Sequence, residues 1–198
     1  MYSILKRIFD FIASLIALLV LSPILLIIAL WISIDSKGGP FYKQIRVGLN
    51  GVEFKLYKFR SMRVNADKQG QITIGNDNRV TSVGRFIRKY KIDEIPQLFN
   101  ILKGDMSVVG PRPEVPKYVA LYSTEQREVL RVKPGLTDYA SLEYIDEQKI
   151  LGQSNDPNNT YIKEIMPAKL ALNRKYIEER SVLTDCKLII NTLLRILN

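Results

Sequence analysis

The longest apolar run of the sequence lies near its N-terminus, between Phe11 and Ile34. No residue in this run is charged, and as a helix it is long enough to cross the roughly 30 Å hydrocarbon core of a bilayer. A cleaved signal peptide is a poorer interpretation, because its apolar part usually covers about 7 to 15 residues. The pattern therefore predicts a helix embedded in a membrane.

Ser22 and Pro23 interrupt this run near its middle. Proline removes a helix hydrogen bond and clashes with the preceding turn, whereas a serine hydroxyl can bond to a freed carbonyl and make a kink tolerable in lipid. Positive residues mark the cytoplasmic side of a membrane, and here they lie on both sides, with Lys6 and Arg7 before the run and Lys37 after it. A re-entrant helix that returns to the same face of the membrane places the positive residues of both flanks on the cytoplasmic side. A kinked membrane span is the alternative that these residues leave open.

Beyond the run, short periodic segments alternate with turn signals. Residues 41–46 and 52–59 read as two strands, and the Asn-Gly pair between them predicts a hairpin. Lys58 and Arg60 would project from one face of the second strand, either toward a ligand or as solvated basic surface or partners of lipid phosphates. Helical periodicity predicts helices over residues 81–91, 115–131 and 167–180, with a last helix capped by Thr184 or Asp185. Residues 64–78 and 152–159 are predicted loops. The last helix is expected either at the membrane interface or packed on the domain.

A short helix is also predicted after Asp93, which is a favourable N-cap residue, and it ends at Gly104. Glu94 then lies in the first turn, where the helix dipole favours an anion and free amides can hold a phosphate. A capped helix with acidic residues in its first turn usually has a structural role alone, and this is the alternative to a functional site. The predicted apolar face consists of Ile95, Leu98, Phe99 and Leu102.

Arginines lie on both sides of this helix in the sequence. Arg85 and Arg88 are one turn apart on the predicted helix 81–91, so one edge of that helix can carry positive charge to the carboxylates. Arg112 lies in a Gly-Pro-Arg-Pro turn that presents a single guanidinium, which suits bidentate recognition of a phosphate. Ordinary surface arginine is the alternative for Arg88.

Composition narrows the chemistry. Lys and Arg total 29 against 20 acidic residues, and this net charge of +9 suits nucleic acid, an anionic membrane or phosphorylated substrates. The chain has no histidine and a single cysteine, Cys186, which excludes histidine-based catalysis and structural zinc. Any metal must be held by oxygen, which indicates magnesium, or manganese in its place.

The order of the motifs resembles the signature of the bacterial sugar transferases, the monotopic phosphoglycosyl transferases. The resemblance rests first on the stretch Asp93-Glu94-x-Pro-Gln-Leu-x-Asn-x-Leu-x-Gly-Asp-Met-Ser-x-Val-Gly-Pro-Arg-Pro. Further motifs are Lys6-Arg7-x-x-Asp10, Ser22-Pro23, Gln44-x-Arg46-x-Gly48, Tyr57-Lys58-Phe59-Arg60-Ser61-Met62, Asp77-x-Arg79, Gly84-Arg85-x-x-Arg88 and Lys133-Pro134-Gly135-Leu136-Thr137. Residues 137–141 read Thr-Asp-Tyr-Ala-Ser, where the commoner family pattern is Thr-Gly-Trp-Ala-Gln, so the sequence does not indicate the sugar.

This resemblance implies an α+β, predominantly helical fold. A re-entrant membrane helix would occupy residues 1–36 and break at Ser22 and Pro23. A small β-hairpin and a compact cytosolic catalytic domain with interfacial amphipathic helices would occupy residues 37–198. The expected location is the cytoplasmic face of the bacterial inner membrane, in contact with its lipids.

The resemblance also implies a reaction, the transfer of a sugar 1-phosphate from a UDP-sugar to polyprenyl phosphate with release of UMP. Asp93 would be the nucleophile, and Glu94 a metal ligand, an orienting group or a base. Asp93 and Glu94 are also the expected ligands of the magnesium ion. Phosphate-binding candidates are Arg88, Arg112, Lys58, Arg60 and Arg85.

Two other classes of function remain as alternatives. A membrane-anchored basic domain that binds nucleic acid would show salt-dependent oligonucleotide binding, but the sequence lacks a nucleic-acid motif and we expect no such partner. A non-catalytic scaffold of a glycan-assembly complex would keep its cellular function when Asp93 is replaced by Asn. The sequence leaves open whether the chain forms a homo-oligomer.

Overall fold

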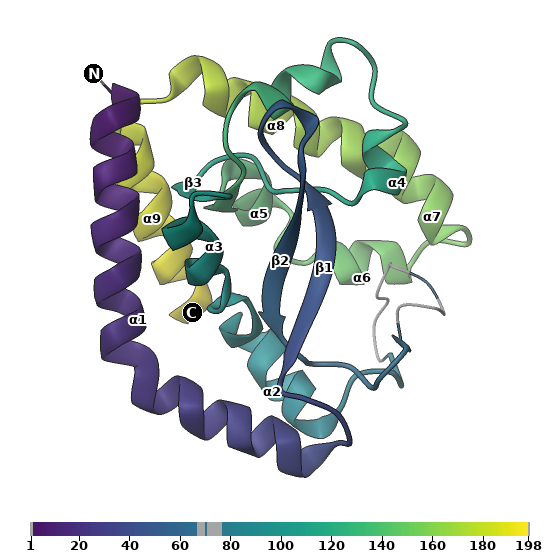
Figure 1. The fold of residues 1–198 in the computed structure, drawn as a ribbon. Coiled ribbons are helices and arrows are strands. Elements are labelled where there is room, and N and C mark those ends of the chain that lie inside the picture. Colours follow the sequence, from purple (N-terminus) through teal and green to yellow (C-terminus); the bar gives the residue numbers. More distant parts are fainter. Residues whose placement is uncertain (1, 67–69, 71–76, 198) are drawn as a thin grey trace.

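The computed structural model describes residues 2–66, 70 and 77–197. Helices dominate this part of the chain, and two short two-stranded sheets complete a predominantly helical α+β fold, as predicted (Figure 1). Most of the predicted loop 64–78 lies outside the described residues.

The N-terminal helix α1 (Tyr2–Asp35) bends sharply near its middle (Figure 1). Pro23 lies inside the helix and has no amide hydrogen for the carbonyl of Leu19, four residues earlier. The Ser22 hydroxyl donates to that same carbonyl at 2.8 Å. The predicted roles of Ser22 and Pro23 in forming and satisfying a kink are thus visible in the structure. Within the described ranges, α1 is the helix long and apolar enough to cross a membrane.

The inner face of α1 is buried on both sides of the bend. Leu18 packs with Leu98 of α3 (Gln97–Lys103), and Ile32 packs with Ile87 of α2 (Ser82–Lys89). Both halves of the helix therefore rest on the same folded domain. The outer face exposes apolar side chains, including Ile4, Ile8, Ile12, Leu15, Ile16, Leu19, Val20, Leu26, Ile27, Leu30 and Ile34.

Polar contacts fix the first half of α1 to this domain. The Lys6 ammonium lies 2.6 Å from the carboxylate of Asp185, and the Val108 amide donates to the Asp10 carboxylate at 3.0 Å. Arg7 donates to the last carbonyls of α3 at 2.6 and 2.8 Å, where the helix dipole favours a cation. The Lys6-Arg7-x-x-Asp10 motif thus docks α1 on the domain.

The predicted hairpin is confirmed. Strands β1 (Phe41–Val47) and β2 (Glu53–Phe59) pair antiparallel from Phe41 opposite Phe59 to Val47 opposite Glu53. A 3-10 turn, η1 (Leu49–Gly51), joins them, and Asn50 and Gly51 have φ angles of 56° and 79°. Asn and Gly tolerate this left-handed conformation better than other residues, which explains the hairpin signal.

The segment around Asp93 differs from the prediction. The predicted helix 81–91 is confirmed as α2, capped by the hydroxyl of Thr81. The chain then turns at Lys91, which has a φ of 55°, into a 3-10 turn, η3 (Ile92–Glu94). Asp93 is therefore inside this turn and is not an N-cap, because α3 begins only at Gln97. The amides of Glu94 and Ile95 bond to carbonyls of the turn, so they are not free to hold a phosphate.

Helix α3 ends at Gly104, which has a φ of 90°, as predicted. Its predicted apolar face is partly wrong, because Phe99 is 49% exposed whereas Ile101 is fully buried. α3 presents Leu98 and Ile101 to α1, and Ile95 and Leu102 of the predicted face pack against the same cluster. On α2, Phe86 likewise stays half exposed and contacts Trp31 at the edge of α1.

A parallel pair of three-residue strands, β3 (Ser107–Val109) and β4 (Gly135–Thr137), was not predicted. Gly110 and Gly135 lie so close that a Cβ on Gly135 would come within 2.1 Å of the Gly110 amide nitrogen. This close approach brings the Gly-Pro-Arg-Pro turn of Arg112 beside the start of β4.

The predicted helix 115–131 is partly wrong, because it is not continuous. The structure has a short α4 (Pro116–Val119) and a 3-10 helix, η4 (Gln126–Arg131). Ser123 interrupts the helical pattern, because its amide donates to the Gln126 side chain and its hydroxyl accepts from the Gln126 amide. These reciprocal bonds resemble a capping box and start a new segment.

The C-terminal part is helical. The predicted loop 152–159 is partly wrong, because α7 begins at Pro157 and Asp156 caps it. The predicted helix 167–180 is confirmed as α8, but the last helix is capped by Ser181 and not by Thr184 or Asp185. The elements are α5 (Tyr139–Glu143), α6 (Glu147–Gly152), α7 (Pro157–Thr160), the π-helix η5 (Tyr161–Ile165), α8 (Met166–Glu179) and α9 (Val182–Leu197).

Candidate active site

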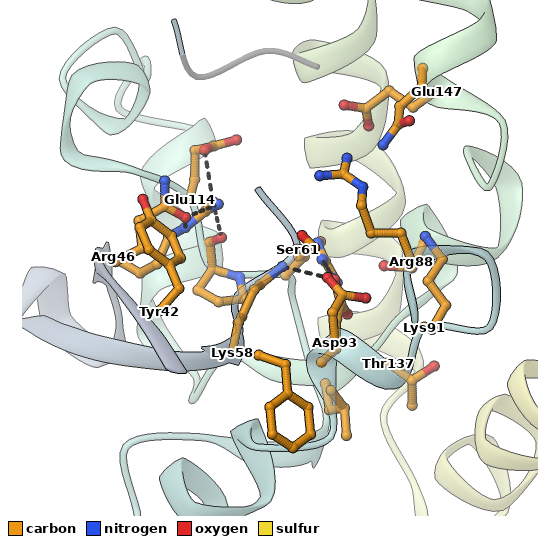
Figure 2. Close-up of a pocket in the computed structure, with 18 of the residues that line it drawn as sticks. Tyr42, Arg46, Lys58, Ser61, Arg88, Lys91, Asp93, Glu114, Thr137 and Glu147 are labelled. Carbon is orange, nitrogen blue, oxygen red and sulfur yellow. Dashed lines mark hydrogen bonds and ion pairs between the residues drawn. The ribbon is translucent and has the colours of Figure 1, made fainter. Parts of the chain in front are cut away.

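A cavity of about 1100 Å³ lies among the hairpin, η3, β4 and the C-terminal helices. Charged side chains from separate segments surround it (Figure 2). The predicted residues Asp93, Glu94, Lys58, Arg88 and Arg112 all line this cavity. The fold therefore brings most of the predicted site residues together.

Glu94 is held by two cations. The Lys58 ammonium lies 3.0 Å from its carboxylate, and Arg112 donates to both carboxylate oxygens, with one distance of 3.1 Å. This fork-to-fork geometry is the one by which arginine binds a carboxylate or a phosphate. In the structure Arg112 therefore binds Glu94 in the manner that the sequence suggested for a phosphate.

Asp93 has a different environment although it is the next residue. It is 7% exposed, and within the described part of the chain no hydrogen bond or ion pair engages its carboxylate. Burial raises the pKa of Asp93, and Glu94 adds to this effect, while Lys58 and Arg88 oppose it. Asp93 is thus a buried carboxylate with unused acceptor capacity that faces the cavity (Figure 2).

Burial and neighbouring charges also shift the pKa values of Glu94, Lys58 and Arg112. Burial would raise the pKa of Glu94, but Arg112 and Lys58 hold it well below its usual range. Burial lowers the pKa of Lys58, and Glu94 opposes that shift. The charge of Glu94 raises the pKa of Arg112. Arg112 and Lys58 thus favour the anionic form of Glu94, which keeps these two cations in position.

Arg88 and Lys91 supply positive charge that Glu94 does not neutralise. Both line the cavity near Asp93 (Figure 2), and the described residues provide no ion pair for either side chain. Their charges favour ionised Asp93. Either cation is free to meet an anionic ligand.

Arg60 and Arg85 have other partners. The Arg60 guanidinium lines the cavity but donates to the carbonyls of Ser36, Lys37 and Gly38, so it joins the end of α1 to β2. Arg85 donates to the Ser82 hydroxyl and the Val80 carbonyl and lies outside the cavity lining. Arg60 thus borders the same cavity as Arg112 and Lys58 but is engaged by backbone carbonyls, whereas Arg85 lies away from it.

A second buried cluster on the cavity was missed as a site. Arg46 donates to the Gln44 side chain at 2.7 Å and to the Glu114 carboxylate at 3.2 Å, and Tyr161 donates to the same carboxylate. Figure 2 shows Arg46 and Glu114 beside Tyr42. Burial lowers the pKa of Arg46, and Glu114 opposes the shift. Gln44 and Arg46 are two residues apart and therefore share one face of the strand, and this spacing was the sequence feature that could have indicated the cluster.

Asp138 was also missed. It is fully buried, accepts the Arg112 amide at 2.9 Å and accepts the Ser141 amide at 2.6 Å. One carboxylate therefore joins the turn of Arg112 to the start of α5. The sequence feature that could have indicated Asp138 is the departure from the commoner family pattern, which has glycine at this position.

The predicted metal can be tested against these donors. The described residues contain no cluster of three acidic or cysteine side chains that would enclose a metal ion. Glu94 is occupied by Lys58 and Arg112, whereas Asp93 has free oxygen atoms on the cavity. Magnesium commonly binds through one or two carboxylates together with substrate phosphates and water. The donors fit a magnesium ion of that kind.

The family of bacterial sugar transferases matches residues 1–198. The UDP-N-acetylgalactosamine-undecaprenyl-phosphate N-acetylgalactosaminephosphotransferase of Aeromonas hydrophila is 37% identical over 202 residues, which cover 99% of this chain and 44% of that protein. The UDP-glucose:undecaprenyl-phosphate glucose-1-phosphate transferase of Klebsiella pneumoniae is 40% identical, over 96% of this chain and 39% of that protein.

A relative of similar length also exists. The exopolysaccharide production protein PSS of Rhizobium leguminosarum bv. phaseoli is 38% identical, over 96% of this chain and 93% of that protein. The chain thus spans less than half of the Aeromonas and Klebsiella proteins but nearly all of the Rhizobium protein. Because the match extends over all 198 residues and includes the site around Asp93, the chain belongs to the bacterial sugar transferase family.

Proposed function

We propose that this protein transfers a sugar 1-phosphate from a UDP-sugar to polyprenyl phosphate and releases UMP, as the first membrane step of bacterial glycan assembly. The names of the Aeromonas and Klebsiella relatives combine a UDP-sugar with undecaprenyl phosphate. Those names differ in the sugar, so they support the class of reaction and leave the sugar open.

The observation that carries this proposal is the contrast between two adjacent carboxylates. Glu94 is neutralised by Lys58 and Arg112, whereas Asp93 faces the cavity without a partner among the described residues. A nucleophile needs a free lone pair, and a carboxylate can form a covalent phosphoryl intermediate. The proposal therefore assigns nucleophilic attack to Asp93 and orientation of the cations to Glu94.

The first step is a displacement at the phosphorus attached to the sugar. An Asp93 carboxylate oxygen forms a bond to this phosphorus, and the bond to the bridging oxygen breaks. The electron pair leaves with UMP, and an aspartyl phosphosugar remains. In the second step a phosphate oxygen of polyprenyl phosphate attacks the same phosphorus. The bond to Asp93 breaks, and its carboxylate is regenerated.

Cations must hold the anionic substrates during both steps. Arg88 and Lys91 are available for phosphate oxygens, because Glu94 engages neither side chain. Arg112 and Lys58 border the same space and stabilise developing negative charge from preorganised positions. Magnesium, or manganese in its place, would be held through Asp93 and the substrate phosphates beside Glu94. When bound, it neutralises charge on the transferring group.

The membrane arrangement follows from α1. Both halves of the bent helix pack on one domain, and the outer face of both halves is apolar. This geometry supports a re-entrant helix over residues 1–36 that leaves both ends, and the catalytic domain 37–198, on the cytoplasmic face of the inner membrane. The cavity would then lie near the headgroups, where the phosphate of a lipid acceptor is found.

A panel of UDP-sugars, assayed with polyprenyl phosphate and magnesium, tests the function. At least one donor should release UMP in proportion to the lipid-linked sugar diphosphate formed. EDTA should abolish turnover, and magnesium or manganese should restore it. If no donor in a complete panel releases UMP with wild-type protein, the proposed reaction is wrong.

A further inference from the structure

The cavity extends beyond the carboxylates and cations around Asp93. Its volume of about 1100 Å³ exceeds the roughly 300–1,000 Å³ of most pockets for one small molecule. Another part, which we call the apolar end, is lined by aliphatic side chains from four elements. They are Leu21 of α1, Leu98 of α3, Leu136 of β4, and Ile189, Leu193 and Ile196 of α9.

The apolar end is continuous with the reaction site. Asp93, Ile95 and Leu98 all line the cavity; Asp93 lies in η3, Leu98 lies in α3, and Ile95 lies between the two elements. The wall therefore changes from a carboxylate to aliphatic side chains within five residues of chain. A ligand that reaches Asp93 with a phosphate has an apolar surface directly beside that phosphate.

The apolar end also adjoins the surface that the proposed topology places in lipid. Leu21 lies at the bend of α1, between the exposed residues Leu19 and Ile24. Leu193 lines the cavity and is still 57% exposed, so this part of the cavity is open. Leu194, the next residue of α9, is 54% exposed and does not line the cavity.

We propose that the apolar end holds the first isoprene units of the acceptor, between the bend of α1 and helix α9, while the acceptor phosphate lies at Asp93. This inference rests on the proposed function. A UDP-sugar is polar along its whole length, so it has no group that matches this wall. An isoprenoid chain joined to a phosphate matches both parts of the cavity and their order. Arg195 of α9 also lines the cavity, and its long side chain can keep its charge at the headgroup level.

Photolabelling of the full chain in nanodiscs tests this site without requiring turnover. The probe is a polyprenyl phosphate with a diazirine in its second isoprene unit. Peptide mapping should place the label on α9 around Leu193, or on Leu98, Leu136 or Leu21. Excess unlabelled polyprenyl phosphate should compete. Label confined to the outer face of α1, such as Ile8 or Leu26, would show only contact with bulk lipid and would overturn the proposal.

Two adjacent substitutions provide a matched pair. Leu193→Gln places an amide in the apolar end, and Leu194→Gln makes the same change on the neighbouring surface. Leu193→Gln should raise the KM for long-chain polyprenyl phosphate about tenfold or more, with little effect on an acceptor that has no isoprene unit, such as methyl phosphate. Leu194→Gln should leave both values unchanged. Equal effects of the two variants would contradict a specific site.

The donor half-reaction separates this inference from the proposed function. UMP release from the UDP-sugar without acceptor should be the same in wild type and in both variants. Loss of this release in Leu193→Gln alone would place Leu193 in the donor site and refute an acceptor role. Normal release with labelling elsewhere would refute the acceptor site while leaving the proposed function intact. Absence of this release in wild type would refute the covalent mechanism, whereas absence of UMP release with both substrates present would refute the proposed function.

Discussion

Asp93 and Glu94 are adjacent in the chain, yet their charges should affect stability in opposite directions. Asp93→Asn removes a buried charge that has no partner among the described residues, so the variant should be as stable as wild type or more stable. Glu94→Gln leaves Lys58 and Arg112 without their anion, and breaking a buried pair in this way costs roughly 3–5 kcal/mol.

Thermal unfolding of the ligand-free variants in one detergent would measure this contrast. Glu94→Gln should melt clearly below wild type and Asp93→Asn should not. The assigned environments would be wrong if the two melting temperatures fell together.

Asp138 should act on the site through Arg112. A carboxylate can accept from both the Arg112 and the Ser141 amides, whereas an asparagine has one acceptor oxygen and can keep only one of these bonds. Asp138→Asn should therefore reduce kcat/KM for UMP release about tenfold or more, since one hydrogen bond to a charged group contributes roughly 1.5–3 kcal/mol. Asp138→Gly, which restores the residue of the commoner family pattern, removes both bonds and should also lower the melting temperature.

A melting temperature measured beside the kinetics separates positioning from folding. Asp138→Asn with wild-type kinetics would show that Asp138 serves stability alone.

The elements differ in how far local sequence determines them. The hairpin 41–59 and helix α8 could be predicted, because an Asn-Gly turn and a helical period lie within each segment. Strands β3 and β4 could not, because three-residue strands carry no period and their pairing joins residues far apart in the chain. Asp93 was identified as a site residue, but its place in a 3-10 turn depends on the left-handed conformation at Lys91.

The arginines differ in the same way. The positions of Arg60 and Arg85 on their elements were predictable, but their partners are backbone carbonyls and a serine brought near by the fold. The partner of Arg112 was unpredictable for the same reason, because Glu94 occupies the guanidinium expected to bind phosphate.

The bend of α1 yields a test of topology. Cys186 is exposed and should first be replaced by Ser. Single cysteines at positions 3 and 65 should then react with a membrane-impermeant reagent only after the cytoplasmic side is opened. Replacing Ser22 with Ala and Pro23 with Leu removes the break and should move position 3 toward the opposite side. A periplasmic position 3 in the otherwise native chain would contradict re-entry.

In the whole molecule, a bent helix packs on one domain beside a cavity that is charged at Asp93 and apolar near α9. This arrangement suits a reaction between a water-soluble nucleotide sugar and a lipid phosphate. It also predicts that the donor reacts before the acceptor arrives, because the unpaired carboxylate belongs to the protein itself.

The most direct test of this account omits the acceptor. Wild-type protein with its UDP-sugar and magnesium should release up to one UMP per active site and gain the mass of one phosphosugar, which peptide mapping should place on Asp93. Asp93→Asn should release no such burst while remaining folded in the membrane. Release of UMP only in the presence of polyprenyl phosphate, with no adduct trapped on the protein, would contradict the covalent mechanism and indicate direct transfer between the substrates.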